Sequence, residues 1–229
     1  MELTAMGASP AYALPQSLPF GVTLRKASIA GVAAVVVVLL VGNLVILGLH
    51  LLARQTVSAG TVTLPGIENF RVVDDKLWRG SHPSRSDYSL LADRGVKTIV
   101  DLRAETGLDV PRRLLDRLGV TLVSIPIRDG QAPTQGQVNR FLRVVQNSEG
   151  TVYVHCMAGV GRTGAMVAAY LVGMENTSAM SALHANLSVG PPSLEQMAFV
   201  AGNIEEPNLL VTGLSRVLDG PRRIWSRVT

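Results

Sequence analysis

The chain has 229 residues, 47% of them hydrophobic and 17% charged, with a formal net charge of +4. That length allows one domain of ordinary size plus further segments, and the scattered basic residues do not form a nucleic-acid-binding arm, so no nucleic acid partner is expected. The single cysteine, Cys156, excludes an intramolecular disulfide and a zinc cluster built on several thiolates.

The chain begins with a polar, proline-containing segment followed by a long apolar one. Residues 1–24 are rich in Ala, Pro and Ser and are expected to form a flexible tail. Residues 25–54 are predicted to be a transmembrane anchor, because the stretch from Ala27 to Leu52 has no charged side chain. As a helix, it is long enough to cross a hydrocarbon core of roughly 30 Å. A buried core helix and a cleaved signal peptide are the alternatives, although the stretch exceeds the roughly 7–15 apolar residues of a signal peptide.

The charges beside the apolar segment give a weak prediction of its orientation. Arg25 and Lys26 precede it, whereas Arg54 alone follows it closely. The positive-inside rule therefore favours, by a single charge, a cytoplasmic amino terminus and a main domain outside the cytoplasm.

Residues 55–68 carry Thr, Ser, Gly and Pro and are predicted to be a linker.

Residues 69–204 alternate strand and helix patterns, as expected for one α/β domain with a central, mainly parallel sheet covered by helices on both faces. Strands are expected at 70–73, 77–79, 96–102, 120–125 and 152–154, and the first two should form a hairpin. Helices are expected at 84–94, 111–119, from Thr134 past Val145, 162–172, 178–187 and 193–202.

Residues 205–229 are predicted to be a solvated tail, with contact between its arginines and lipid headgroups as the alternative.

The segment between the strand at 152–154 and the next helix carries the chemistry. It reads His155-Cys156-Met157-Ala158-Gly159-Val160-Gly161-Arg162-Thr163-Gly164. Its glycines permit a tight loop whose backbone N–H groups turn inward, and the following helix adds its positive end. The residues expected to bind phosphate are Met157, Ala158, Gly159, Val160, Gly161 and Arg162. Cys156 would supply a nucleophilic thiolate and Arg162 a planar fork for phosphate oxygens, with no metal or cofactor expected.

This segment resembles the HCxxxxxR[S/T] signature of the protein tyrosine phosphatase superfamily, and its GxGRTG ending is similar to the atypical, bacterial-type dual-specificity branch. The resemblance runs roughly from Phe70 to Val200. It implies a cysteine phosphatase fold, with Asp129 as the general acid, Thr163 as the hydroxyl that steadies the leaving thiolate, and His155 orienting the loop.

Several of these residues also have ordinary structural explanations. Asp129 precedes Gly130 and could be a simple turn aspartate, while Asp101, a rival acid, is expected to be structural. Gln196 could position water or merely complete a capping box. The two other histidines of the domain, His82 and His184, are expected at the surface.

The resemblance implies a phosphatase acting on phosphotyrosine or phosphoserine/threonine proteins, or on a small phosphate ester, and the apolar segment at 25–54 is expected to anchor it in a membrane. Inositol phosphates or phospholipids are an alternative, but Met157 and Val160 stand where phosphatases of the lipid type carry lysines. A catalytically silent phosphate-binding module is another alternative. A sulfurtransferase of the rhodanese type would leave the Gly-Arg-Thr-Gly helix start without a reason.

Overall fold

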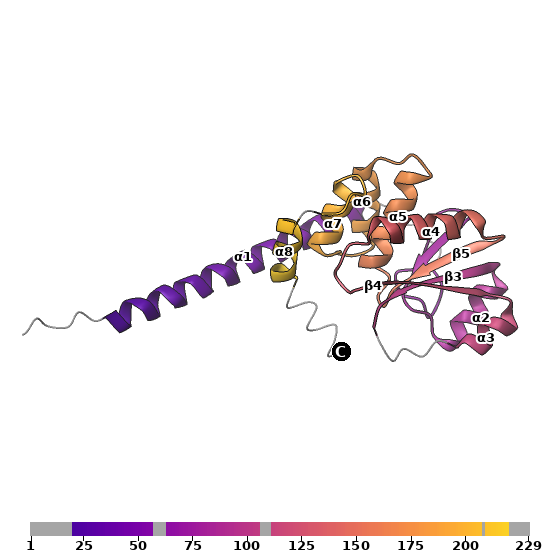
Figure 1. Ribbon diagram of the computed structural model, residues 1–229, viewed down its shortest axis with the longest axis horizontal. Helices are drawn as coiled ribbons and strands as arrows, with labels where there is room; N and C mark the ends of the chain where they lie inside the picture. Colours follow the sequence, from indigo (N-terminus) through magenta and orange to yellow (C-terminus); the bar gives the residue numbers. More distant parts are fainter. Residues whose placement is uncertain (1–19, 57–62, 106–110, 208, 220–229) are drawn as a thin grey trace, which may run out of the picture. The chain divides into compact units, whose positions relative to one another are not determined.

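The computed structural model describes residues 20–56, 63–105, 111–207 and 209–219 (Figure 1). The chain divides into two compact units, Met1–Val41 and Gly42–Thr229. Helix α1 (Phe20–Thr56) contributes the described part of the first unit and continues into the second. Its segment Gly31–Gln55 is long and apolar enough to cross a membrane, a property that a signal sequence near the amino terminus would share.

The second unit contains a five-stranded sheet in the order β1-β2-β5-β3-β4. The strands are β1 (Arg71–Val72), β2 (Leu77–Gly80), β3 (Val96–Arg103), β4 (Thr121–Ile127) and β5 (Thr151–His155). β1 pairs antiparallel with β2 as the expected hairpin, and all other neighbours are parallel. The sheet is therefore mixed, with a parallel majority and an antiparallel edge strand.

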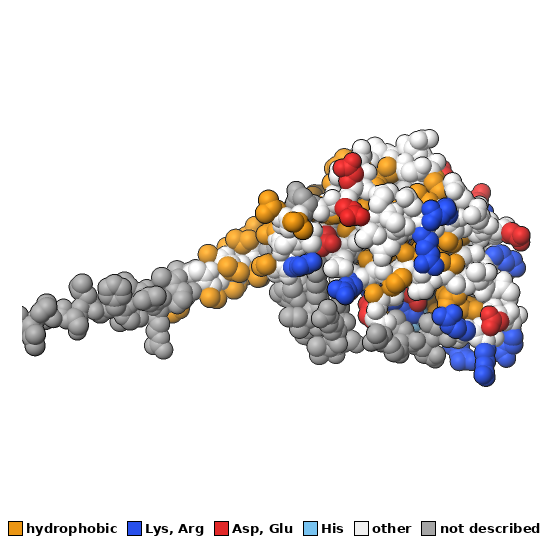
Figure 2. Space-filling view, viewed as in Figure 1, with side chains coloured by type: hydrophobic (Ala, Val, Ile, Leu, Met, Phe, Trp, Pro, Cys, Tyr) orange, Lys and Arg blue, Asp and Glu red, His pale blue; other side chains and the backbone are white. Residues whose placement is uncertain are grey.

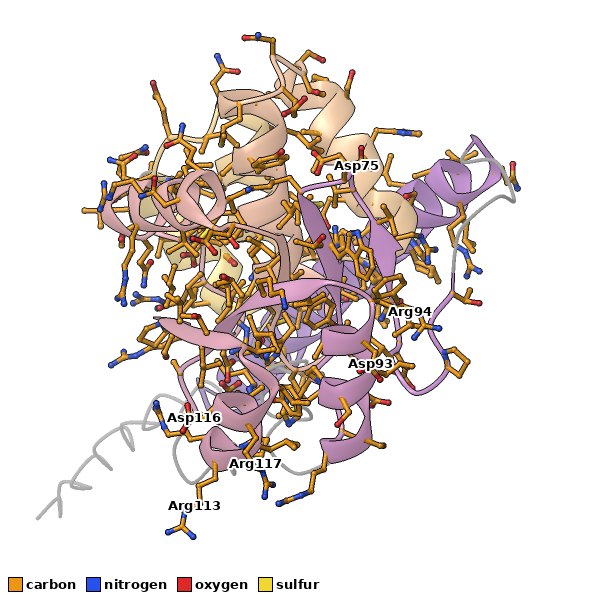
Figure 3. The ribbon with its side chains drawn as sticks, turned by 90° about the vertical axis from the view of Figure 1, so that its right-hand side faces the viewer. Asp75, Asp93, Arg94, Arg113, Asp116 and Arg117 are labelled. Atoms are coloured by element: carbon orange, nitrogen blue, oxygen red, sulfur yellow. The ribbon has the colours of Figure 1, made fainter. Side chains whose placement is uncertain are left out.

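Helices cover both faces of this sheet (Figures 1 and 3). On one face lie α2 (Arg85–Asp93) and α3 (Arg112–Leu118), and on the other lie α4 (Gln135–Asn147) and α5 (Gly161–Gly173). α6 (Ala179–Val189) and α7 (Leu194–Ala201) follow and contact α5. In Figure 3, Arg113, Asp116 and Arg117 of α3 point away from the sheet, as amphipathic packing requires.

The ends of the predicted helices are set by local sequence. Thr134 Oγ1 accepts a hydrogen bond from the Gln137 amide at 3.3 Å, and the Gln137 side chain accepts one from the Thr134 amide at 2.8 Å. This reciprocal pair satisfies two amide donors that the first turn of α4 leaves unpaired. Gly119 ends α3 in the left-handed conformation, with φ 64°, which glycine adopts without a steric penalty.

Two apolar cores form, one on each face of the sheet. Phe141 of α4 and Met166 of α5 are fully buried against one face, and Tyr88 and Leu91 of α2 are buried against the other. Each such side chain contributes about 1.5–3 kcal/mol by leaving water. The sheet between the two cores is therefore a rigid support for the loops at its edge.

The structure contains one helix that the sequence analysis did not predict. Helix α8 (Leu209–Leu218) lies in the segment interpreted as a solvated tail and contacts α7. The segment was interpreted as solvated because of its arginines, whereas the structure attaches it to α7 through the buried polar side chains of Ser215 and Asp219.

Candidate active site

The cysteine-containing loop lies between β5 and α5, beyond the carboxyl end of the central strand. β5 is flanked by β2 and β3, with His155 level with Gly80 on one side and Asp101 on the other. Open parallel sheets bind ligands at this edge. The strand-to-helix placement predicted for the loop is confirmed by these bounds.

The carbonyl groups of the loop are held from outside by neighbouring segments. The His82 amide donates to the Met157 carbonyl at 2.9 Å, and the Asn69 side chain donates to the Ala158 carbonyl at 2.9 Å. Because each peptide unit points its N–H opposite to its C=O, fixing these carbonyls outward turns the loop's N–H groups toward the interior.

Arg79 of β2 holds the second half of the loop. Its guanidinium donates to the Gly159 carbonyl at 2.6 Å and to the Val160 carbonyl at 3.3 Å, and it lies 3.4 Å from Asn186 Oδ1 of α6. Burial lowers the pKa of Arg79 to about 10, while the nearby Cys156 opposes that shift. Arg79 is thus a buried, charged residue that fixes the second half of the loop by hydrogen bonds to its carbonyl groups.

Gly159 is required by both the conformation and the space available. It adopts φ 73°, which L-residues rarely adopt. A Cβ at this position would also overlap the backbone of Gly80 in β2. The glycine therefore lets the loop approach β2 closely enough for Arg79 to bind the loop carbonyls.

Cys156 lies at the floor of this loop and is 3% exposed. Thr163, in the first turn of α5, is fully buried, and its Oγ1 has no hydrogen-bond partner among the described residues. Arg162 Nε is likewise buried and unpaired within the described part of the chain. Unpaired buried donors are costly, so their occurrence here indicates a place made for an acceptor-rich ligand.

Arg162 is oriented by groups from three other segments. Its guanidinium donates to Glu105 at 2.9 Å and to the Ile127 carbonyl at 3.2 Å, and lies 3.4 Å from Asp129 Oδ1. Burial alone would lower the pKa of Arg162, but the hydrogen bond that Arg162 donates to Glu105 and the adjacent Cys156 outweigh burial and raise the pKa. The guanidinium therefore stays charged and in a fixed orientation.

Asp129 lies on the loop between β4 and α4, with its side chain 41% exposed. The first turn of α7 supports this loop: Ser193 Oγ donates to the Gly130 carbonyl at 2.7 Å, and Gln196 donates to the Gln131 carbonyl at 3.1 Å. The structure places Asp129 next to Arg162, and its assignment as the acid stays a prediction. Gln196 also completes the capping box with Ser193, which confirms its structural alternative.

His155 and Asp101 form a buried support under the loop. The His155 ring contacts the Cys156 carbonyl through Nδ1 at 3.0 Å and lies 4.0 Å from Asp101. Burial lowers the pKa of His155 to about 4, despite the opposing charge of Asp101. Asp101 makes a bidentate pair with Arg103, its closest contact being 2.7 Å, so the expected structural role of Asp101 is confirmed.

The prediction of a surface position was wrong for His82 and right for His184. His82 is partly buried, with its ring 5.4 Å from that of His155 and 6.3 Å from that of Tyr88. The reason is that its own amide binds the Met157 carbonyl, which holds the ring against the loop. His184, on α6, is exposed.

Sequence reasoning missed the roles of Arg79 and Glu105. Arg79 stands between Trp78 and Gly80 in a buried strand, and an arginine in such a strand is itself an indication of a charged partner. Glu105 follows the carboxyl end of β3, at the same edge as the cysteine loop, so its place in the sheet could have indicated its contact with Arg162.

The chain is similar in sequence and fold to known proteins. The family model described as a DSP-PTPase phosphatase fused to NAD+ kinase matches residues 65–202, more than half of the chain. NAD kinase 2, chloroplastic, of Arabidopsis thaliana is 43% identical over 96 residues, which cover 39% of this chain and 10% of that protein. The dual specificity protein phosphatase CDC14C of Homo sapiens is 50% identical over 44 residues, covering 19% of this chain and 10% of that protein.

Among solved structures, TpbA of P. aeruginosa is similar with a TM-score of 0.53 and 25% identity, covering 69% of this chain and 94% of that one. TpbA has also been solved as a Cys-to-Ser variant in complex with pTyr. The match with each of the two curated relatives spans about a tenth of that protein's length.

Proposed function

We propose that this chain, which belongs to the family of DSP-PTPase phosphatases described as fused to NAD+ kinase, is a cysteine-dependent phosphatase that hydrolyses phosphate monoesters through a phosphocysteine intermediate. The observation that carries this proposal is the loop whose carbonyls are held outward around Cys156, beside two buried donors that lack a partner among the described residues, Arg162 Nε and Thr163 Oγ1. Such a site has donors for the oxygens of a phosphoryl group and a nucleophile beneath its phosphorus atom.

In the first step, the Cys156 thiolate attacks phosphorus, so that a P–S bond forms as the P–O bond to the leaving group breaks. Asp129 gives its proton to the departing oxygen, which leaves as an alcohol or phenol. Arg162 and the inward N–H groups stabilise the charge that is spread over the three other phosphate oxygens.

In the second step, water attacks the phosphocysteine and Asp129, now ionised, takes the proton of that water. The P–S bond breaks, inorganic phosphate is released and the thiolate of Cys156 is restored. The hydroxyl of Thr163 supports this departure, because it is buried at the start of α5 with no other hydrogen-bond partner in the described structure.

The charge around the loop favours a protein-borne phosphate over a highly anionic inositol phosphate or lipid. The cysteine loop contributes a single cation, Arg162, and that cation is already bound to Glu105. Met157, the loop side chain with 46% exposure, is neutral and apolar. A substrate with one phosphoryl group on a tyrosine, serine or threonine side chain fits this balance of charge.

We also infer that residues 25–54 anchor this phosphatase in a membrane. The segment Gly31–Gln55 lies within one continuous helix, and Leu44 and Leu52 are 65% and 62% exposed. Exposed apolar side chains along a whole helix are stable in hydrocarbon, whereas exposing them to water costs free energy.

The proposed function is tested by Cys156→Ser with p-nitrophenyl phosphate as substrate. Turnover should fall by at least about 10⁴-fold, because serine is a far weaker nucleophile at neutral pH. Binding of inorganic phosphate should persist, because the N–H groups and Arg162 are unchanged. Turnover within about tenfold of the unsubstituted protein, in a variant with the same melting temperature, would contradict the proposed function.

A further inference from the structure

Helix α8 is attached to the protein through polar groups. Ser215 is fully buried, and its Oγ accepts from the Glu195 amide at 3.2 Å and donates to Asp219 Oδ2 at 2.5 Å. Asp219, 3% exposed, accepts from the Leu194 amide at 3.2 Å. The polar face of α8 thus caps the first turn of α7, whose amide donors would otherwise be unpaired.

The opposite face of α8 is apolar and exposed. Leu209, Leu210, Leu214 and Val217 are 90%, 83%, 52% and 60% exposed, and Figure 2 shows hydrophobic side chains at the surface there. Positions 210, 214 and 217 share one face of a helix. A helix on the surface of a soluble domain normally buries this face and exposes its polar one, so the arrangement in α8 is the reverse of the usual one.

The charge around α8 indicates what covers this face. From residue 208 to the end of the chain there are four arginines and a single acid, Asp219, which is buried. Trp225 and Ile224 follow in the same sequence. Apolar side chains combined with arginines and tryptophan favour an anionic membrane surface. A second copy of this chain would bring two arginine-rich segments together, which their mutual repulsion opposes.

The end of the proposed membrane span contacts the same group of helices. His50 of α1 lies 2.6 Å from the Leu187 carbonyl of α6, and Ala53 is 2% exposed. Residues from Gly42 onward belong to the same compact unit as the domain. α6 in turn contacts α7, to which α8 is attached.

We propose that the apolar face of α8, formed by Leu209, Leu210, Leu214 and Val217, inserts into the interfacial layer of an anionic lipid bilayer. α8 is then a second membrane contact, which restricts rotation of the phosphatase domain about its anchor. This inference rests on the proposed membrane anchoring of the chain and is independent of the phosphatase chemistry.

The test places a fluorescent label at single positions of the full chain in vesicles of phosphatidylcholine and phosphatidylserine. In a Cys156→Ser background, the environment-sensitive dye NBD is attached at Leu214→Cys on α8. Leu44→Cys reports the anchor, and Asp93→Cys, at the exposed end of α2, is the matched control (Figure 3). Lipids brominated on their acyl chains should quench the label at position 214 about twofold or more beyond the control.

Each outcome decides between the proposals. Quenching at position 214 as weak as at position 93 overturns the α8 inference, and so does a blue-shifted emission without lipid quenching, which would mean that protein covers the face. Quenching at position 44 reports the anchor separately, so the two proposals can fail independently. Adding Arg216→Gln should reduce the signal at position 214 only when phosphatidylserine is present, whereas Arg113→Gln on α3 should not.

Discussion

Two carboxylates contact Arg162, and they differ in exposure and in the segment that carries them. Glu105 follows β3 and binds the guanidinium at 2.9 Å, whereas Asp129, 3.4 Å away, lies on a loop between β4 and α4. Burial would raise the pKa of Glu105, but its hydrogen bond from Arg162 outweighs burial and lowers it. An ionised Glu105 cannot donate a proton, so Glu105 is a positioning residue and Asp129 the candidate acid.

We expect Asp129→Asn to affect substrates according to their leaving groups. The rate constant for phenyl phosphate should fall about 10²–10³-fold, because its phenolate needs a proton as it departs. The loss for p-nitrophenyl phosphate should be smaller, since that leaving group is more acidic. Asp116→Asn, at an exposed carboxylate on α3, is the control and should change neither rate (Figure 3). Equal losses for both substrates would place the acid elsewhere.

The buried neutral state of His155 predicts a defined loss of stability in acid. Burial lowers its pKa to about 4, whereas the unfolded chain has the ordinary value of 6.5. Between these values the unfolded state binds more protons, so the free energy of unfolding falls as the pH decreases from about 6.5 to about 4, by up to about 3 kcal/mol. Burial would raise the pKa of Asp101, but the hydrogen bond from Arg103 outweighs it and lowers that pKa, so Asp101 loses its contribution only as the pH falls below the ordinary value of 3.8.

His155→Asn should remove most of this pH dependence while lowering stability at pH 7. A smaller pH dependence of the free energy of unfolding should remain in the variant, because burial lowers the pKa of His82 as well. Melting temperatures of both proteins at pH 7 and at about pH 4.5, in the same detergent, measure the difference in slope. An identical loss in the two proteins would show that His155 is not the group that titrates.

At the scale of helices and strands, the sequence predicted the elements whose signals are local. The capping pair of Thr134 and Gln137, the stop at Gly119 and the hairpin before β2 were all recognisable. Likewise, the cysteine loop was placed between strand and helix because the change in pattern falls at its two ends. Local sequence therefore predicted the fold class and the strand and helix that flank the cysteine loop.

The sequence did not predict features that depend on contacts between distant segments. The ion pair between Glu105 and Arg162 joins the end of β3 to the first turn of α5, and the hydrogen bonds from Arg79 join β2 to the loop. His82 was misplaced for the same reason, since its amide binds a carbonyl far along the chain. α8 was missed because the residues that attach it to α7, Ser215 and Asp219, are polar and bind amides of a distant segment.

The loop between β5 and α5 depends on close contact with β2, which Gly159→Ala should disrupt. The added methyl group overlaps the Gly80 backbone and favours a different φ, so the expected cost is about 2–4 kcal/mol, divided between unfolding and phosphate binding. Gly136→Ala on α4, where a Cβ has ample room, is the matched control. If Gly159→Ala bound inorganic phosphate and melted like the control, the loop would not require this contact.

At the scale of the whole molecule, successive contacts connect α8 to the active site. α8 caps the first turn of α7, and the same turn of α7 holds the Asp129 loop through Ser193 and Gln196. The rigid sheet supports the cysteine loop from the other side. A membrane contact at α8 would therefore be connected to Asp129, the candidate acid, through α7 and the loop between β4 and α4.

The proposed reaction requires a covalent phosphocysteine at Cys156. The most direct measurement is rapid acid quenching of Asp129→Asn during turnover of p-nitrophenyl phosphate, followed by mass analysis of the peptide that contains Cys156. Removing the base that activates water should make the phosphoenzyme accumulate, so we expect one added phosphoryl group on that peptide and none when Cys156→Ser is combined with it. An unmodified peptide during continuing turnover, or phosphate on another residue, would contradict the proposed mechanism.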